Sequence, residues 1–134
     1  MGTAAWLTPA QASTARSVLQ TLKSAHEGIE GCAFMTSDGR VAASVLGTGT
    51  DPDRFAAMCA ALIALATRAA REAERGELQQ LIIEGRAGPM LLTRAGEHGV
   101  LAVSAKAECP LGRLILDART ASRSLSSVFI DPGE

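Results

Sequence analysis

Histidine and cysteine are the residues from which a metal site or a nucleophilic catalyst would be built, and this chain has few of them. It contains His26 and His98 and three cysteines, Cys32, Cys59 and Cys109. No two cysteines have Cys-x-x-Cys spacing, and neither histidine has another histidine or cysteine two to five residues away, as a structural zinc site requires. We therefore predict no metal and no cofactor. Each cysteine lies in an apolar run, which is typical of a small buried side chain in a reducing compartment.

Two short patterns share features with phosphate-binding or hydrolytic motifs. The Gly-x-Gly-x-Asp run at 47–51 precedes a predicted helix, but it lacks the Gly-Lys-Ser/Thr of a P-loop and the third glycine of a dinucleotide fingerprint. Asp51 would also repel a phosphate at the start of that helix. The chain has no Gly-x-Ser-x-Gly elbow, and Ser-Asp-Gly at 37–39 is better explained as a hairpin turn. These patterns favour a protein that is not an enzyme.

Composition and charge restrict the class of protein further. The chain has 134 residues, 47% of them hydrophobic and 20% charged, which is typical of one globular domain. Its 13 basic and 14 acidic residues give a net charge of −1, and aromatic residues make up only 3%, so a general nucleic-acid surface is disfavoured. Neither a signal-peptide pattern nor an apolar run of membrane-spanning length is present, so we predict a cytoplasmic protein without membrane insertion.

Capping and turn residues divide the chain into alternating helices and strand groups. Thr8-Pro9 and Asp51-Pro52 are typical helix starts, and Gly76 is placed to end the long second helix. Apolar spacing predicts helices over 9–27, 52–75 and 110–125, and strands over 29–36, 41–46, 78–84, 89–94 and 100–105. Pairs and triplets of strands joined by helices exclude a doubly wound parallel sheet and favour one antiparallel sheet with helices on its faces. We expect a lead at 1–8, a domain at 9–126 and a tail at 127–134.

The helix predicted at 52–75 has more apolar surface than one sheet can cover. Its predicted core stripe contains Phe55, Met58, Cys59, Leu62, Ala66 and Ala69, flanked by Ile63 and Leu65. The opposite face begins with Ala57, Ala60, Ala61 and Ala64. Alanine is also the best helix former, so these residues alone do not require a partner. Since a helix that is apolar on most sides is usually buried on most sides, we predict that this face forms a dimer contact.

The order of these elements and several local sequences resemble the Roadblock family, the dynein-light-chain-related domain that regulates small Ras-like GTPases. The resemblance covers about residues 9–125. It rests on Gly-Ile-Glu-Gly-Cys-Ala-Phe-Met-Thr-Ser-Asp-Gly at 28–39, on Asp-Pro-Asp-Arg-Phe at 51–55, on Leu-Ile-Ile-Glu-Gly at 81–85 and on Val-Leu-Ala-Val at 100–103. None of these stretches is a catalytic signature, but their order and spacing agree with one another.

The resemblance implies an α+β fold, a profilin-like α/β sandwich with the order α-β-β-α-β-β-β-α. A five-stranded antiparallel sheet would lie between the long helix on one face and two helices on the other. Family members form homodimers or heterodimers, in which the third strand pairs with its counterpart and the long helices lie side by side. Carried over to this chain, the joining edge would contain Leu78, Gln80 and Ile82, and the helix contact Ala57, Ala60, Ala61 and Ala64.

The resemblance also implies a non-enzymatic, dimeric regulator or scaffold that binds a Ras-like small GTPase. Arg54, Arg68 and Arg71 are candidates for the GTPase-binding surface by position only. An arginine inserted into a GTPase site accelerates hydrolysis by several orders of magnitude, whereas charges at a helix end are usually only solvated. The alternative is a small-molecule sensor, or a scaffold subunit of a signalling complex without a GTPase. A sensor requires a concave apolar pocket with convergent polar groups.

Overall fold

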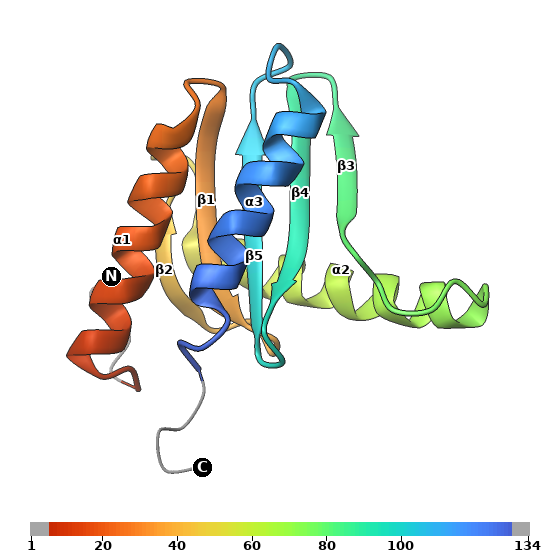
Figure 1. Cartoon of the computed structure of the whole chain (residues 1–134), viewed down its shortest axis with the longest axis horizontal. Helices are drawn as coiled ribbons and strands as arrows, with labels where there is room; N and C mark the ends of the chain where they lie inside the picture. The colour runs from red at the N-terminus through yellow and green to blue at the C-terminus, as the bar shows by residue number, and fades with distance from the viewer. Residues whose placement is uncertain (1–5, 130–134) are drawn as a thin grey trace.

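The structure, a computed structural model, describes residues 6–129, so the predicted lead before residue 6 and the tail from residue 130 lie outside the described residues. The helices are α1 (Pro9–Ala25), α2 (Pro52–Glu72) and α3 (Leu111–Leu125). The strands are β1 (Ile29–Thr36), β2 (Val41–Val45), β3 (Leu81–Gly85), β4 (Gly88–Ala95) and β5 (Gly99–Ala105). This order confirms the predicted one (Figure 1). Strand β3 begins three residues later than predicted, and α2 ends at Glu72 instead of residue 75.

All strand pairs in the sheet are antiparallel, and their order is β2-β1-β5-β4-β3. The longest pairing joins β1 to β5, with Ala33 opposite Ala102. Strand β3 pairs with β4 alone, from Leu81 opposite Leu92 to Gly85 opposite Gly88, and lies at one edge of the sheet. The five-stranded antiparallel sheet is therefore confirmed, and β3 has a second side that meets no other strand of the described chain.

The helices cover the two faces of the sheet unequally. Helices α1 and α3 pack together on one face, where Leu19, Phe34 and Leu114 are fully buried. Helix α2 lies alone on the other face, over a smaller core that includes Met35, Ile63 and Leu92. Figure 1 shows α2 crossing behind the strands, with its C-terminal half projecting past β3. This sandwich matches the predicted layers, one long helix against two shorter ones.

Helix starts follow the predicted capping chemistry. The Thr8 hydroxyl accepts the Gln11 N–H at 3.1 Å while the Gln11 side chain accepts the Thr8 N–H at 2.9 Å, which completes a capping box at α1. The Asp51 side chain accepts the Asp53 N–H at 3.0 Å, with Pro52 as the first residue of α2. None of the helices between residues 6 and 129 is long and apolar enough to cross a membrane.

Helix α2 is rotated relative to the predicted core stripe. Its buried residues are Ala56, Cys59, Ala60 and Ile63. Met58 and Leu62, both predicted in the core, are 52% and 38% exposed. The prediction was wrong at these two positions and at Ala69, which is also exposed, because adjacent apolar arcs of α2 satisfy the helical period equally well. The arc with the smaller side chains faces the sheet, and it lets the β1–β2 turn approach closely: a Cβ atom at Gly39 would lie 3.1 Å from Ala57 Cα.

The described parts of the predicted lead and tail pack against the core. Leu7 and Val128 are buried, and the ring of Phe129 stacks on Phe34 with centroids 4.7 Å apart. The Gln11 Nε2 group donates to the Val128 carbonyl at 2.7 Å, which ties the segment after α3 to the start of α1. The packed part of the chain thus extends beyond residues 9–126 at both ends.

Candidate dimerisation and partner-binding surface

An uncovered apolar stripe runs along the side of α2 that faces away from the sheet. Met58, Leu62 and Leu65 are 52%, 38% and 63% exposed, and Ala61 between them is also exposed. Spacings of three, four and seven residues place these side chains on one face of a helix. We call Met58, Ala61, Leu62 and Leu65 the outer stripe of α2. It lies on the other side of the helix from Cys59 and Ile63, which contact the sheet.

The edge strand β3 adds an exposed apolar residue to the same side of the molecule. Leu81 packs with the core under α2, whereas Ile82 packs with the core under α1 and α3. Because successive strand residues point to opposite faces, Ile83 lies on the α2 face of the sheet, and it is 38% exposed. Four of the six large apolar residues that are exposed within residues 6–129 therefore belong to the α2 side, and the other two belong to α3. Such clustering is typical of an interaction surface.

The residues predicted at the dimer contact do not all share this surface. Ala57, Ala61 and Ala64 are exposed on α2, whereas Ala60 is only 6% exposed because it faces the sheet. Leu78 and Gln80 are half-buried and precede β3. Ile82 lies in β3 with its side chain toward α1 and α3. Their role in a dimer stays a prediction. Of the predicted contact, the fold leaves accessible the free side of β3 and the side chains of Ala57, Ala61 and Ala64.

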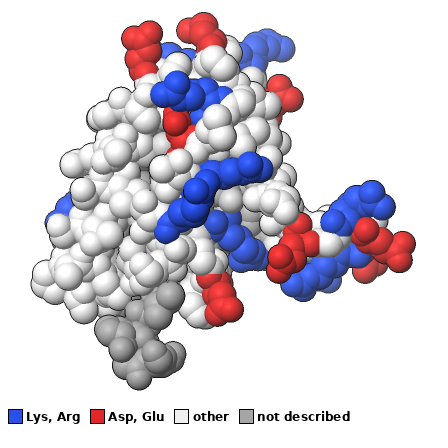
Figure 2. Space-filling model, viewed as in Figure 1, with Lys and Arg blue, Asp and Glu red and all other residues white. Residues whose placement is uncertain are grey.

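The three candidate arginines are all exposed on α2. Arg54 lies one turn before Met58, and Arg68 lies seven residues after Ala61, so both border the outer stripe. Arg71 lies near the C-terminal end of the helix, seven residues after Ala64. None of the three forms an ion pair within residues 6–129. The projecting end of α2, at the right in Figure 2, carries basic and acidic side chains together, whereas the surface over α1 at the left is mostly uncharged.

The titratable groups give little support to catalysis. Burial raises the pKa of the Cys32 thiol to about 11, with a small opposing effect from Lys23, and burial alone raises the pKa of Cys59 to about 11. Burial and the Asp117 carboxylate raise the pKa of Cys109, against the effect of Arg113. Nucleophilic cysteines have a lowered pKa, so these thiols are in the unreactive state at neutral pH. No group of three or more His, Cys, Asp or Glu side chains suited to a metal ion occurs between residues 6 and 129.

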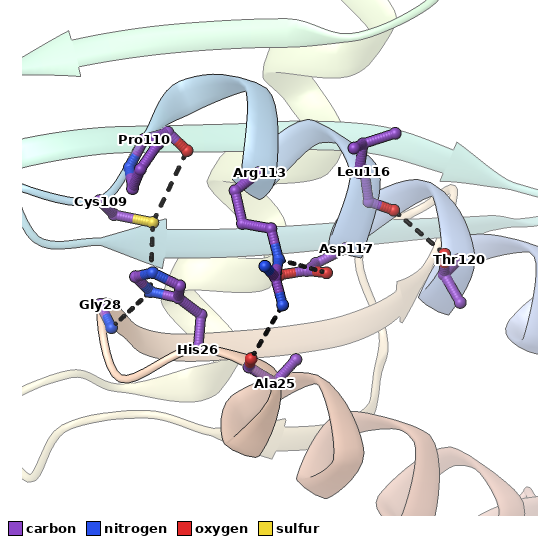
Figure 3. A network of polar contacts seen from close by, with 9 residues as sticks. All are labelled: Ala25, His26, Gly28, Cys109, Pro110, Arg113, Leu116, Asp117 and Thr120. Atoms are coloured by element: carbon purple, nitrogen blue, oxygen red, sulfur yellow. Dashed lines mark hydrogen bonds and ion pairs between the residues drawn. The ribbon is translucent and has the colours of Figure 1, made fainter.

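A polar network joins the end of α1, the start of β1 and the start of α3 (Figure 3). His26 Nδ1 accepts the Gly28 N–H at 2.8 Å, and Cys109 Sγ lies 3.8 Å from the same nitrogen. Arg113 pairs with Asp117 at 3.2 Å and donates to the Ala25 carbonyl at 3.4 Å. A Cβ atom at Gly28 would lie 2.8 Å from Cys109 Cβ, so the segments are in close contact. Because the thiol keeps its proton and the His26 acceptor is already used, the network connects elements and does not form a Cys–His nucleophile.

Sequence reasoning missed the outer stripe, although one signal for it was available. Met58, Leu62 and Leu65 recur at spacings of four and three, but the same spacings also fit a core face. The face that meets the sheet carries Ala56, Cys59, Ala60 and Ile63, whereas Ala57, Ala61 and Ala64 are exposed. The choice between these faces depends on packing against β1 and β5, which the sequence pattern does not report.

Comparisons with known proteins agree with this fold. Residues 15–105 match the Roadblock/LC7 domain. An uncharacterised protein of Methanocaldococcus jannaschii is 36% identical over 103 residues, which cover 77% of this chain and 90% of that protein. The gliding protein MglB of Thermus thermophilus has a TM-score of 0.79 at 20% identity, covering 96% of this chain and 97% of its own. A structure of MglB with a tetrameric arrangement has a TM-score of 0.81 at 20% identity, covering 96% of each chain.

The profilin-like character of the fold is also confirmed. Profilin II of Acanthamoeba castellanii has a TM-score of 0.60 at 14% identity and covers 84% of this chain and 96% of its own. At such identity the likeness concerns the fold alone, whereas the domain match covers most of the chain and the archaeal relative exceeds 30% identity. On these grounds the chain belongs to the Roadblock/LC7 domain family.

Proposed function

We propose that this protein is a dimeric, non-enzymatic regulator or scaffold that binds a Ras-like small GTPase. The observation that carries the proposal is the outer stripe of α2, where Met58, Leu62 and Leu65 are exposed together on a helix that projects past its own sheet. Exposed apolar clusters of this kind on a soluble domain favour contact with another protein. Membership of the Roadblock/LC7 family is consistent with a regulatory or scaffolding role.

Self-association is the first part of the proposal. The free side of β3 offers unpaired backbone groups, and Ile83 and the outer stripe lie on the same side of the molecule. A second copy, or a paralogue, would pair with this edge and cover the apolar side chains of α2. The MglB structure with a tetrameric arrangement supports self-association in a protein of this fold. We expect Ala61→Glu and Ala64→Arg to weaken the dimer, since the first adds a charge within the outer stripe and the second adds one beside it.

Binding of a GTPase is the second part of the proposal. Because a second copy would cover the outer stripe, the GTPase would contact the charged side chains that border it, Arg54 and Arg68, on the paired α2 helices. The described part of the chain offers no activated nucleophile, so we propose that the protein acts by preferring one conformation of the GTPase switch segments. Such a preference requires different affinities for the GDP-bound and GTP-bound forms.

A binding measurement tests the GTPase proposal. The full chain would be titrated by calorimetry with a Ras-like GTPase encoded in the same genome, loaded with GDP or with a non-hydrolysable GTP analogue. We expect a complex whose affinity depends on the nucleotide, and Arg68→Ala should reduce it, whereas Arg16→Ala on the exposed side of α1 should not. Equal affinity for the GDP-bound and GTP-bound forms would indicate a scaffold that does not regulate the GTPase. Absence of binding to every such GTPase of that organism would contradict the proposal.

A further inference from the structure

A pocket of about 600 Å³ lies where four loops and segment ends meet. None of its lining residues belongs to the outer stripe. Its walls come from residues 6–8 and Gln11 at the start of α1, the β1–β2 turn, His98 in the β4–β5 turn, and Phe129 after α3. The volume lies within the range of pockets that hold small molecules. The hydrogen bond from Gln11 to the Val128 carbonyl, 2.7 Å long, holds two of these walls together.

One side of the pocket is aromatic, in a chain that has only three phenylalanines and one tryptophan. The rings of Trp6 and Phe129 line it with centroids 5.5 Å apart, and Phe129 stacks in turn on the buried Phe34 at 4.7 Å. The Arg40 guanidinium lies over the Trp6 ring, 4.4 Å from its centroid. Three of the four aromatic side chains thus form one cluster at this pocket, in which Phe129 stacks on Phe34 and the Trp6 ring is tilted by 38° against Phe129. Such a cluster offers an apolar wall for a flat or aliphatic group.

The pocket also has polar lining residues, among them Thr36, Ser37, Asp38 and His98. Asp38 is the only carboxylate among the lining residues. Asp38 is exposed, its Oδ1 accepts a hydrogen bond from the Thr36 hydroxyl, and it joins no ion pair within residues 6–129. Arg40, two residues further on, is placed over Trp6. Asp38 is therefore a carboxylate at the pocket wall without a cationic partner in the described chain.

An anion is a poor match for this pocket. Asp38 would repel it, the nearby Arg40 guanidinium is held over the Trp6 ring, and the N–H groups of Thr8 and Gln11 at the start of α1 already donate to each other's side chains. We propose that the pocket binds a small free amine, in which a primary ammonium group contacts Asp38 and an aromatic or aliphatic body lies against Trp6 and Phe129. Ionised hydrogen bonds between an ammonium and a carboxylate are stronger than neutral ones, so charge decides which ligands bind. The pocket also meets the requirement of a sensor, an apolar cavity with convergent polar groups.

Phenethylamine is a suitable probe, with 2-phenylethanol and 3-phenylpropionate as neutral and anionic counterparts of similar size. Each would be titrated into the full ¹⁵N-labelled chain and followed by NMR, where the indole N–H of the single tryptophan gives a separate signal. We expect phenethylamine to cause saturable shifts at the Trp6 indole and the Ser37 and Asp38 amides. Its affinity should exceed that of 2-phenylethanol about tenfold, since a hydrogen bond to a charged group is stronger than a neutral one. 3-Phenylpropionate should not bind.

Substitution of the carboxylate gives the second arm of the test. Asp38→Asn should lower the affinity for phenethylamine about tenfold. Asn-Gly is a favoured hairpin turn, so this variant keeps the turn chemistry. The control is Glu108→Gln, an exposed acid between β5 and α3 that is not among the pocket residues. Absence of saturable shifts, equal affinity for the amine and the alcohol, or an unchanged affinity in Asp38→Asn would each overturn the proposal. The series of three probes on the unmodified chain remains decisive if Asp38→Asn does not fold.

Discussion

Arg94 on β4 reaches across to Thr67 on α2, and its Nη2 donates to the Thr67 hydroxyl at 2.9 Å. The same hydroxyl donates to the Ile63 carbonyl one turn earlier, at 2.7 Å. Thr67 therefore connects the sheet to the helix backbone just after Ile63, the last fully buried residue of α2. This contact fixes how α2 is rotated, and with it the direction in which the outer stripe faces.

Loss of the Arg94 contact should destabilise the α2 layer. Arg94→Met keeps most of the side-chain length but removes the donor, and we expect the free energy of unfolding to fall by about 1–2 kcal/mol. Urea unfolding monitored by circular dichroism would measure the change. Arg86→Met is the matched control, because Arg86 is exposed in the β3–β4 turn. Equal stability of both variants would mean that the Arg94–Thr67 bond does not hold the helix.

Gly39 is a position where only glycine fits without strain. Its φ is +93°, and an added Cβ would lie 3.1 Å from the backbone at Ala57. Since an L side chain in left-handed backbone costs about 1–2 kcal/mol, Gly39→Ala should lower the thermal midpoint by several degrees. Gly49→Ala, at a loop position with no atom within 4 Å of the added Cβ, should have little effect. Similar midpoints for the two variants would show that the β1–β2 turn is not pressed against α2.

Ser37 carries a buried hydroxyl without a hydrogen-bond partner among the described residues. A buried polar group left unpaired is destabilising, so Ser37→Ala should raise the free energy of unfolding by about 1 kcal/mol. Chemical denaturation would measure this against Ser44→Ala, where the side chain is exposed on β2. A loss of stability in Ser37→Ala would indicate that the hydroxyl has a partner in solution.

Stability should decrease at high pH because of the buried thiols. The pKa of Cys32 and of Cys59 rises from 9.0 to about 11 on folding, so the unfolded chain releases these protons at a lower pH than the folded one. The stabilising effect is complete below pH 9 and is lost as the pH rises to 11, by up to about 2–3 kcal/mol for each thiol. Unfolding in urea between pH 8 and about pH 11 would measure it, and few other groups interfere because the chain has no tyrosine. The variant with Cys32→Ala and Cys59→Ala should show a smaller decrease, and an equal decrease would contradict the assignment.

The layers of the fold could be predicted from the sequence because caps and turns are local signals. Thr8 with Gln11, Asp51 with Pro52, and the turn at 37–40 lie where the elements begin or reverse. The face of α2 that meets the sheet could not be predicted from the sequence. Met58 and Ala60 both belong to apolar arcs of the helix, and only tertiary packing selects between these arcs. The start of β3 was also missed: Leu78 is apolar but precedes the pairing with β4, which begins at Leu81 opposite Leu92.

The pocket was beyond prediction for a different reason. Trp6, Asp38, His98 and Phe129 come from four separate parts of the chain and form no motif in the sequence. Their proximity depends on the close approach of the first and last described segments, where Gln11 binds the Val128 carbonyl. Contacts of this range follow from the topology of the whole fold, whereas sequence patterns report mainly local structure.

The oligomeric state in solution tests whether a second copy of the chain covers the outer stripe of α2. The decisive measurement is the molar mass by light scattering of the unmodified chain and of two variants, Leu65→Asp on α2 and Leu116→Asp on α3, whose leucines are 63% and 61% exposed. We predict twice the chain mass of 13.8 kDa for the unmodified protein and for Leu116→Asp, and the monomer mass for Leu65→Asp. A monomeric unmodified chain at high concentration, or a dimer that Leu65→Asp leaves intact, would contradict the account.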